Sequence, residues 1–171
     1  MLTNDLVLIQ DYNPSWPDTF LKLTAKVKAA LGPLVVTVEH IGSTAVSGLA
    51  AKPIIDLDVV LASSTDLAET IRLLGHIGYI HEGDLDIAGR EAFRSPPNES
   101  PHHLYVLAAG ATELRRHLAF RDALRADNGL RDSYATLKRG FAEAHRGDRS
   151  GYTEAKSAFI SATFSRGTKD D

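Results

Sequence analysis

The sequence has 171 residues, 43% of them hydrophobic and 24% charged, and its formal net charge at pH 7 is −3. This size and composition are typical of one globular domain, and the slight acidity argues against a strongly basic nucleic-acid binder. The sequence contains no cysteine, no apolar run near the roughly 20 residues of a membrane span and no basic start typical of a signal peptide. We therefore expect a single cytoplasmic domain over residues 1–171, without a membrane partner.

The first half of the chain predicts one short strand, one helix and two longer strands. Residues 5–10 have a strand-like composition, and residues 15–31 combine a helix start signal with apolar side chains at steps of three and four. Residues 34–41 and 54–61 are rich in β-branched side chains, which favour strands. Because a short connection of mostly small residues joins them, we expect these two strands to lie side by side in one sheet.

The second half predicts further strands followed by a run of helices. Weak strand signals occupy residues 79–86 and 91–94, and HHLYVLA at residues 102–108 is a stronger one. The remaining periodic segments predict four helices, at residues 65–75, 112–127, 131–145 and 152–165. Because strands mostly precede helices, we predict an α+β fold: a mixed β-sheet covered by helices, with a helical C-terminal part whose helices pack as a group.

Two aspartates interrupt the apolar strand at residues 54–61. Successive side chains of a strand point to opposite faces, so Asp56 and Asp58 share one face, about 6.6 Å apart along the chain. Two carboxylates this close on an apolar strand repel each other and lose hydration, unless a cation or a proton relieves them. We therefore predict that both bind Mg²⁺ or Mn²⁺ on an open face of the sheet. A buried pair of hydrogen-bonded structural acids is the alternative. The similar Asp84-Leu85-Asp86 lies between glycines and predicts a solvated turn.

The turn after residues 34–41 supplies a matching anion site. Gly42 lets the backbone approach a ligand closely, and the small polar residues Ser43 and Thr44 follow it. Backbone N–H groups in such a turn form an anion-binding concavity, and the Ser43 hydroxyl adds a donor. Phosphates held here would lie near the metal of Asp56 and Asp58, which is the arrangement that phosphoryl-type transfer requires.

Several further cations and histidines are candidates outside these two motifs. Arg94, Lys138 and Lys156 could reach a triphosphate, although a solvated role is the alternative for each of them. We expect His40 and His117 to be ordinary packing residues.

Five segments of the chain resemble the GrpB family, within the nucleotidyltransferase superfamily of the DNA polymerase β type. They are YNPSWP at residues 12–17, EHIGSTAVSGLAAKPIIDLDV at 39–59, HHLYV at 102–106, RRHLAFRDALR at 115–125 and YTEAKSAFI at 152–160. The superfamily motif within them is Gly-Ser, a dozen residues, then Asp-hydrophobic-Asp in a strand. The resemblance implies a nucleotidyltransferase-like fold along nearly the whole chain.

The resemblance also implies roles for individual residues. Gly42 and Ser43 would contact nucleotide phosphates, and Asp56 and Asp58 would bind the metal. Active members of the superfamily usually add a third carboxylate from a later strand. Here the corresponding strand offers His103 and Tyr105 on one face, so His103 is the candidate to replace that acid. Tyr105 stands where GrpB proteins commonly have a further histidine, and the chain departs from its family there.

The first hypothesis for function is therefore a metal-dependent transferase that moves a nucleoside monophosphate from a nucleoside triphosphate to an unknown acceptor. GrpB-like domains also occur fused behind dephospho-coenzyme A kinase, where they are associated with its correct folding. The second hypothesis is therefore a non-catalytic nucleotide-binding or folding-helper domain with a coenzyme A biosynthesis enzyme as partner. A phosphohydrolase that uses the same aspartates is the third. The sequence has no GxxxxGK[ST] loop and thus no kinase of this type.

Overall fold

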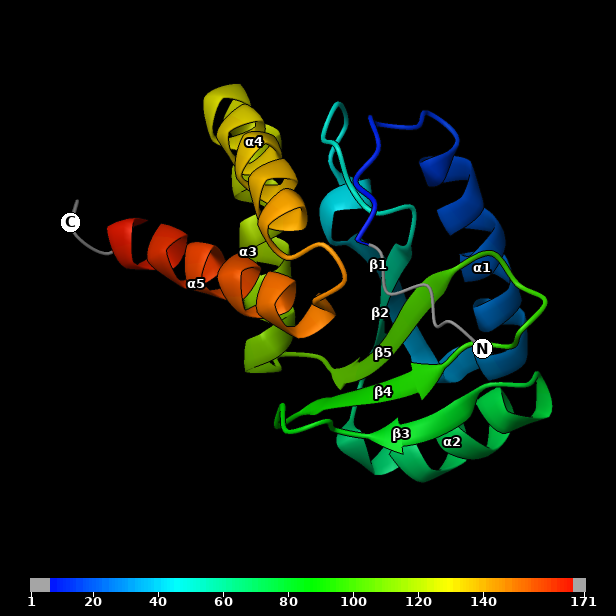
Figure 1. The fold of residues 1–171 in the computed structure, drawn as a ribbon. Coiled ribbons are helices and arrows are strands. Elements are labelled where there is room, and N and C mark those ends of the chain that lie inside the picture. Colours follow the sequence, from blue (N-terminus) through cyan, green and yellow to red (C-terminus); the bar gives the residue numbers. More distant parts are fainter. Residues whose placement is uncertain (1–6, 168–171) are drawn as a thin grey trace.

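Five strands form one mixed sheet in the structure, a computed structural model that describes residues 7–167 and the side chains as far as residue 163 (Figure 1). The strands are β1 (Val35–Ile41), β2 (Ile55–Leu61), β3 (Ile80–Gly83), β4 (Arg90–Arg94) and β5 (His102–Ala108). Their order in the sheet is β1-β2-β5-β4-β3, with β2 and β5 parallel and the other neighbours antiparallel. The predicted pairing of the two apolar strands is thereby confirmed, as is the α+β class.

The helices are α1 (Trp16–Leu31), α2 (Leu67–His76), α3 (Thr112–Ala126), α4 (Asn128–Ala144) and α5 (Arg149–Gly167). The last two begin three residues earlier than predicted, because acidic side chains cap their first turns. Asp127 accepts a hydrogen bond from the amide of Leu130, and Asp148 accepts one from the amide of Gly151. None of the helices in the described part is long and apolar enough to cross a membrane.

One predicted strand is not formed by its described residues, and another is shorter than predicted. Of the predicted strand at residues 5–10, residues 5 and 6 lie outside the described residues, and Gln10 makes only an isolated bridge with Ala51. The predicted strand at 79–86 ends at Gly83, because Leu85 and Asp86 have positive φ angles of 48° and 64°. Asp84-Leu85-Asp86 is thus part of an exposed turn between β3 and β4, as predicted.

Helices α1 and α2 cover one face of the sheet and build the main core with it (Figure 1). Every second residue of the two central strands faces these helices, which is the period-2 pattern of a half-buried strand. The buried side chains are Ile55, Leu57, Val59 and Leu61 of β2, Leu104 and Val106 of β5, and Trp16, Leu23, Val27, Leu31 and Leu74 of the helices. The other residues of the central strands are therefore turned towards the C-terminal helices.

Helices α3, α4 and α5 lie together beside the opposite face, as predicted for the C-terminal part (Figure 1). Leu114 of α3 packs on Val60 and Leu107 at one end of the two central strands. Tyr134 of α4 stacks on Phe159 of α5, with ring centroids 5.1 Å apart, and packs against Val46 in the β1–β2 connection. These contacts leave the polar middle of this sheet face between the strands and α5.

Candidate active site in the groove between the sheet and the C-terminal helices

The register of the three neighbouring strands collects polar side chains in the middle of this face. Asp56 pairs with His103 and Asp58 with Tyr105 along the parallel strands β2 and β5. Glu39 of β1 lies opposite Asp58 on the other side. Because paired residues of neighbouring strands project to the same face, all five side chains stand on the side of α3 to α5.

Asp56 and His103 form the accessible half of this polar cluster. Nδ1 of His103 donates a hydrogen bond to Oδ1 of Asp56 over 2.8 Å. The side chain of Asp56 remains 25% exposed and that of His103 43% exposed. With Nδ1 engaged, the lone pair of His103 Nε2 is directed away from the aspartate, so this imidazole has the arrangement of a general base.

Asp58 is fully buried, and α3 covers it. Its Oδ2 accepts a hydrogen bond of 2.7 Å from Nδ1 of His117, whose Nε2 lies 3.2 Å from Oε1 of Glu113. Burial raises the pKa of Asp58, and the bond with His117 opposes this rise. Burial alone would lower the pKa of His117, but the hydrogen bond and charge of Asp58, with the charge of Glu113, raise it.

These contacts correct two predictions. The face is open at Asp56 only, because α3 closes over Asp58. His117 is not an ordinary packing residue, since it holds one of the two aspartates. His117 lies 59 residues after Asp58 on another element, so no local pattern in the sequence links the two.

Gly42 brings the backbone of the β1–β2 connection against Asp56. Its φ of 72° lies in the region that favours glycine, and a Cβ built there would overlap Oδ2 of Asp56. The next residue, Ser43, lines the groove beside Asp56. Thr44 is buried, and its hydroxyl forms a 2.9 Å hydrogen bond with Nε2 of His40. Of the three residues of the predicted anion-binding turn, Thr44 therefore has its hydroxyl engaged by His40, although it lines the groove.

His40 is a packing residue, as predicted. Its ring stacks on Phe20 with centroids 4.5 Å apart, and burial lowers its pKa to about 4. The neutral imidazole holds the turn at residues 42–44 in place through its hydrogen bond with Thr44.

The groove over Asp56 has two lobes. A cavity of about 240 Å³ contains Lys52, Lys138 and Arg149, and a second of about 520 Å³ contains Arg90 and Arg116. Both lobes share a middle section lined by Ser43, Asp56, Tyr105, Thr153 and Lys156. We call them the cationic lobe and the second lobe. Together they have the size of a small-molecule site.

The lysines of the cationic lobe are partly desolvated and repel one another. Lys138 is only 2% exposed; burial first, and then the charge of Lys156, lower its pKa to about 7. Its Nζ donates a hydrogen bond to the carbonyl of Ala50. Burial and the charges of Lys156 and Arg149 lower the pKa of Lys52 to about 8. No carboxylate of the described residues forms an ion pair with these lysines, which makes the lobe suited to a polyanion.

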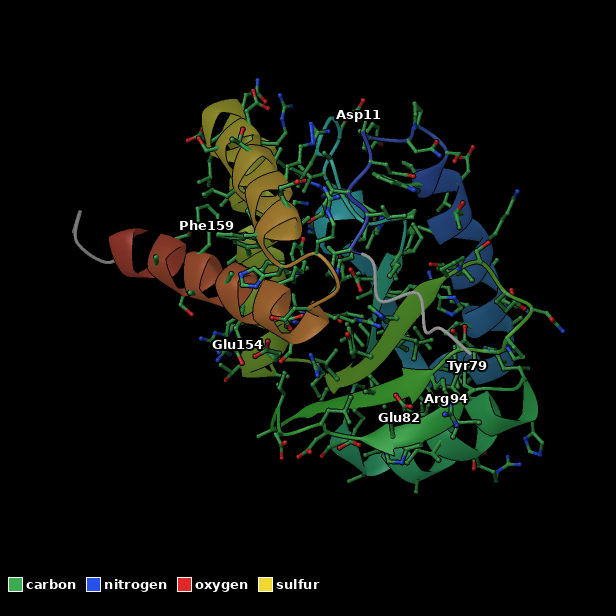
Figure 2. All side chains as sticks on the ribbon, viewed as in Figure 1. Asp11, Tyr79, Glu82, Arg94, Glu154 and Phe159 are labelled. Carbon is green, nitrogen blue, oxygen red and sulfur yellow. The ribbon has the colours of Figure 1, made fainter. Side chains whose placement is uncertain are left out.

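The structure thus brings together most of the predicted site residues. Lys138 and Lys156 reach the groove from α4 and α5, and the solvated role considered for Lys138 is wrong because this side chain is buried. Arg94 lines neither lobe. It is 63% exposed at the end of β4, with its Nε 4.0 Å from Oε1 of Glu82 on β3 (Figure 2).

The sequence analysis missed Lys52, Arg149, Arg90 and His117. Lys52 lies inside the quoted segment at residues 39–59, so its position in the motif was a usable signal. His117 and Arg149 lie on helices whose place over the sheet is decided by tertiary packing, and Arg90 lies on β4, whose place is decided by strand pairing.

The donor set fits a hard divalent cation. Oδ1 of Asp58 is buried and has no hydrogen-bond partner among the described residues, so this charge-bearing oxygen lacks the compensation that burial demands. The described part of the chain holds no cluster of three or more His, Cys, Asp or Glu able to form a complete protein cage. Mg²⁺ does not need one, because it is usually bound by one or two carboxylates together with substrate phosphates and water.

Comparisons with known proteins agree with this fold. A family model described as "GrpB protein" matches residues 6–166. The UPF0157 protein BH1888 of Halalkalibacterium halodurans is 35% identical over 95% of this chain and 83% of its own length. The crystal structure of the conserved protein GrpB from Enterococcus faecalis superposes with a TM-score of 0.82 at 35% identity, over 91% of this chain and 93% of that one.

Two longer proteins are similar to the chain over part of their length. The Cid1 poly(U) polymerase with MgGTP bound has a TM-score of 0.56 at 17% identity, over 79% of this chain and 44% of the polymerase. At this low identity, the superposition shows a shared nucleotidyltransferase-like fold and nothing further. A dephospho-CoA kinase of Mycobacterium tuberculosis is 27% identical over 90% of this chain, which spans 44% of the kinase.

Proposed function

The chain belongs to the GrpB protein family, and we propose that it is a metal-dependent nucleotidyltransferase that moves a nucleoside monophosphate from a nucleoside triphosphate to an acceptor. The observation that carries this proposal is the position of Asp56 in the section shared by the two lobes, between the unpaired cations of the cationic lobe and the second lobe. The likeness in fold to a polymerase with bound MgGTP supports it.

The triphosphate would occupy the cationic lobe. Lys52, Lys138 and Arg149 offer it positive charge that the described carboxylates do not neutralise, and each lysine gains when an anion relieves the mutual repulsion. The Ser43 hydroxyl, in the section shared by both lobes, would donate to a phosphate oxygen near Asp56. Lys156, which lines both lobes, would contact the phosphates where the bond is broken.

The reaction is a substitution at the α-phosphorus. The acceptor oxygen forms a bond to this phosphorus, and the bond between the phosphorus and the oxygen bridging to the β-phosphate breaks. Pyrophosphate leaves with that electron pair, and Nε2 of His103 takes the hydroxyl proton of the acceptor. A bound Mg²⁺ or Mn²⁺ would neutralise charge on the phosphates and lower the pKa of the attacking hydroxyl.

Asp56 and Asp58 would hold the metal, and two histidines orient them. The hydrogen bonds from His103 and His117 engage one oxygen of each carboxylate and leave Oδ2 of Asp56 and Oδ1 of Asp58 for the cation. Glu113 fixes His117 from its other nitrogen. Partners of this kind restrict the orientation of a ligand and tune its basicity.

The test is a product assay with the full chain, Mg²⁺ or Mn²⁺ and a panel of labelled nucleoside triphosphates. Pyrophosphate release that disappears in Asp56→Asn is expected. Release of orthophosphate instead would identify a phosphohydrolase, in which water is the acceptor. Arg72→Gln is the matched control, because Arg72 pairs with Glu69 on the surface of α2, on the other side of the sheet.

A folding-helper role is the second candidate, and one observation favours it. The chain is similar to a segment that makes up 44% of a dephospho-CoA kinase. If no triphosphate releases pyrophosphate but a triphosphate binds tightly, the helper role becomes the better account. A dephospho-CoA kinase refolded with and without the chain then supplies the direct measurement.

A further inference from the structure

We propose that the second lobe binds a small acceptor that carries a phosphate or carboxylate group, and that Arg90 is the residue that binds this group. The inference rests on the proposed transferase function, because it names the chemistry of the molecule that receives the nucleotide. The second lobe lies on the other side of the shared section from the cationic lobe, and its cations Arg90 and Arg116 were not among the predicted site residues.

Arg90 forms no ion pair with a carboxylate of the described residues, although it lies close enough for its charge to act on Asp58. Its guanidinium carbon lies 4.3 Å from the ring centroid of Tyr105. Its Nε is buried and has no hydrogen-bond partner among the described residues. Burying such a donor unpaired is costly, and an arginine fork matches the planar oxygens of a carboxylate or the oxygens of a phosphate. The side chain is therefore preorganised over Tyr105 for an anion that enters the lobe.

Arg90 differs from most other arginines of the chain in its contacts. Of the arginine side chains that the structure describes, only Arg90 and Arg149 have neither an ion pair nor a hydrogen bond with the protein. Arg149 lines the cationic lobe and Arg90 lines the second lobe. These two arginines thus stand in the two halves of one groove.

The pairing of β4 with β5 places Arg90 on the sheet face that carries Tyr105 and Asp56. It pairs with Leu107 of β5, two residues beyond Tyr105 on the strand that also carries His103. An anionic group on Arg90 therefore lies across the shared section from Lys52 and Lys138. A molecule held there extends to Asp56 in the shared section, where its hydroxyl meets the α-phosphorus next to His103, which lines the cationic lobe.

The walls of the second lobe describe the rest of the molecule. Ile41, Phe120 and Ile160 present apolar surface, and the volume of about 520 Å³ suits a compact ligand. Arg116 adds a second positive charge at this lobe, although Glu113 lies 3.7 Å from it. The fit is thus to a small hydroxylated acid or phosphate monoester with an apolar part.

Anion binding can be measured without turnover. The full chain is first saturated with inorganic tripolyphosphate, which occupies the cationic lobe, and is then titrated by calorimetry with phenyl phosphate, benzoate or phenol. We expect saturable binding of phenyl phosphate or benzoate and none of the neutral phenol, and the tighter of the two anions identifies the group. Arg90→Gln should weaken the binding of the small anion at least tenfold and leave tripolyphosphate binding intact. Lys52→Gln should weaken the binding of tripolyphosphate and leave the binding of the small anion intact.

Controls separate this inference from the proposed function and from misfolding. Arg72→Gln, on the far side of the sheet, should bind all probes as the unsubstituted chain does. If Arg90→Gln does not fold, Arg90→Lys keeps the charge but loses the fork, and its affinity should be intermediate. The proposal is overturned if Arg90→Gln binds each of these anions as tightly as the unsubstituted chain does. It is also overturned if the unsubstituted chain binds neither phenyl phosphate nor benzoate saturably. Pyrophosphate release could still be observed in that case, so the transferase function would stand.

Discussion

Replacement of Gly42 by alanine tests the close approach of backbone and carboxylate on which the site depends. Gly42 has φ 72° and ψ −174°, a combination open almost only to glycine, and its occupation by another residue costs about 1–3 kcal/mol. The new Cβ would also overlap Oδ2 of Asp56, so the carboxylate must turn and release His103, a loss of about 1 kcal/mol. The free energy of unfolding should therefore fall by about 2–4 kcal/mol.

A thermal or urea unfolding curve measures this loss. For a chain of this size the melting temperature should fall by roughly 5–15 °C. Gly110→Ala is the matched control, because Gly110 also has a positive φ of 83° but no atom within 4 Å of an added Cβ. Gly110→Ala should therefore lose only the part of the free energy of unfolding that comes from the backbone conformation. If both variants lose the same stability, Asp56 does not lie against the turn, and the proposed joint site for phosphate and metal is refuted.

Three further predictions concern the metal, the nucleotide and pH. Asp58→Asn should keep or raise the metal-free stability in urea, because it removes a buried charge while retaining an acceptor for His117, and it should abolish metal binding. A large loss of stability would instead favour a purely structural acid. Triphosphate at a hundredfold excess over its Kd should stabilise the fold by about 2.7 kcal/mol, and with Mg²⁺ the shift in Tm should exceed the sum of the separate shifts. This synergy should vanish in Asp58→Asn and shrink in Ser43→Ala; equal shifts in all three proteins would place the nucleotide elsewhere. Lys138 has a folded pKa of about 7, below the ordinary lysine value of 10.5, so the unfolded state binds more protons between these values. Lys138 should therefore make the free energy of unfolding rise with pH between about 7 and 10.5. In Lys138→Met, urea unfolding at several pH values should show a smaller rise over the same range.

Local patterns in the sequence determined the elements and the central motif. The alternation of Asp56 and Asp58 with apolar residues follows from the geometry of a strand, and the Gly-Ser turn follows from the backbone freedom of glycine. Both depend on neighbouring residues only, so they could be predicted. The family resemblance extended this prediction to the fold, because its five segments span most of the chain.

Tertiary structure decided which side chains meet across elements. The register of β2 with β5 set His103 beside Asp56, and the packing of α3 brought His117 over Asp58 from 59 residues away. The packing of α4 desolvated its residue Lys138, whose Nζ donates to the carbonyl of Ala50, and the β4–β5 pairing set Arg90 over Tyr105. Register and helix packing are long-range properties, and no periodicity of 2 or 3.6 residues encodes them. The sequence by itself therefore determined the face that carries the chemistry, whereas only the fold decided which residues complete it.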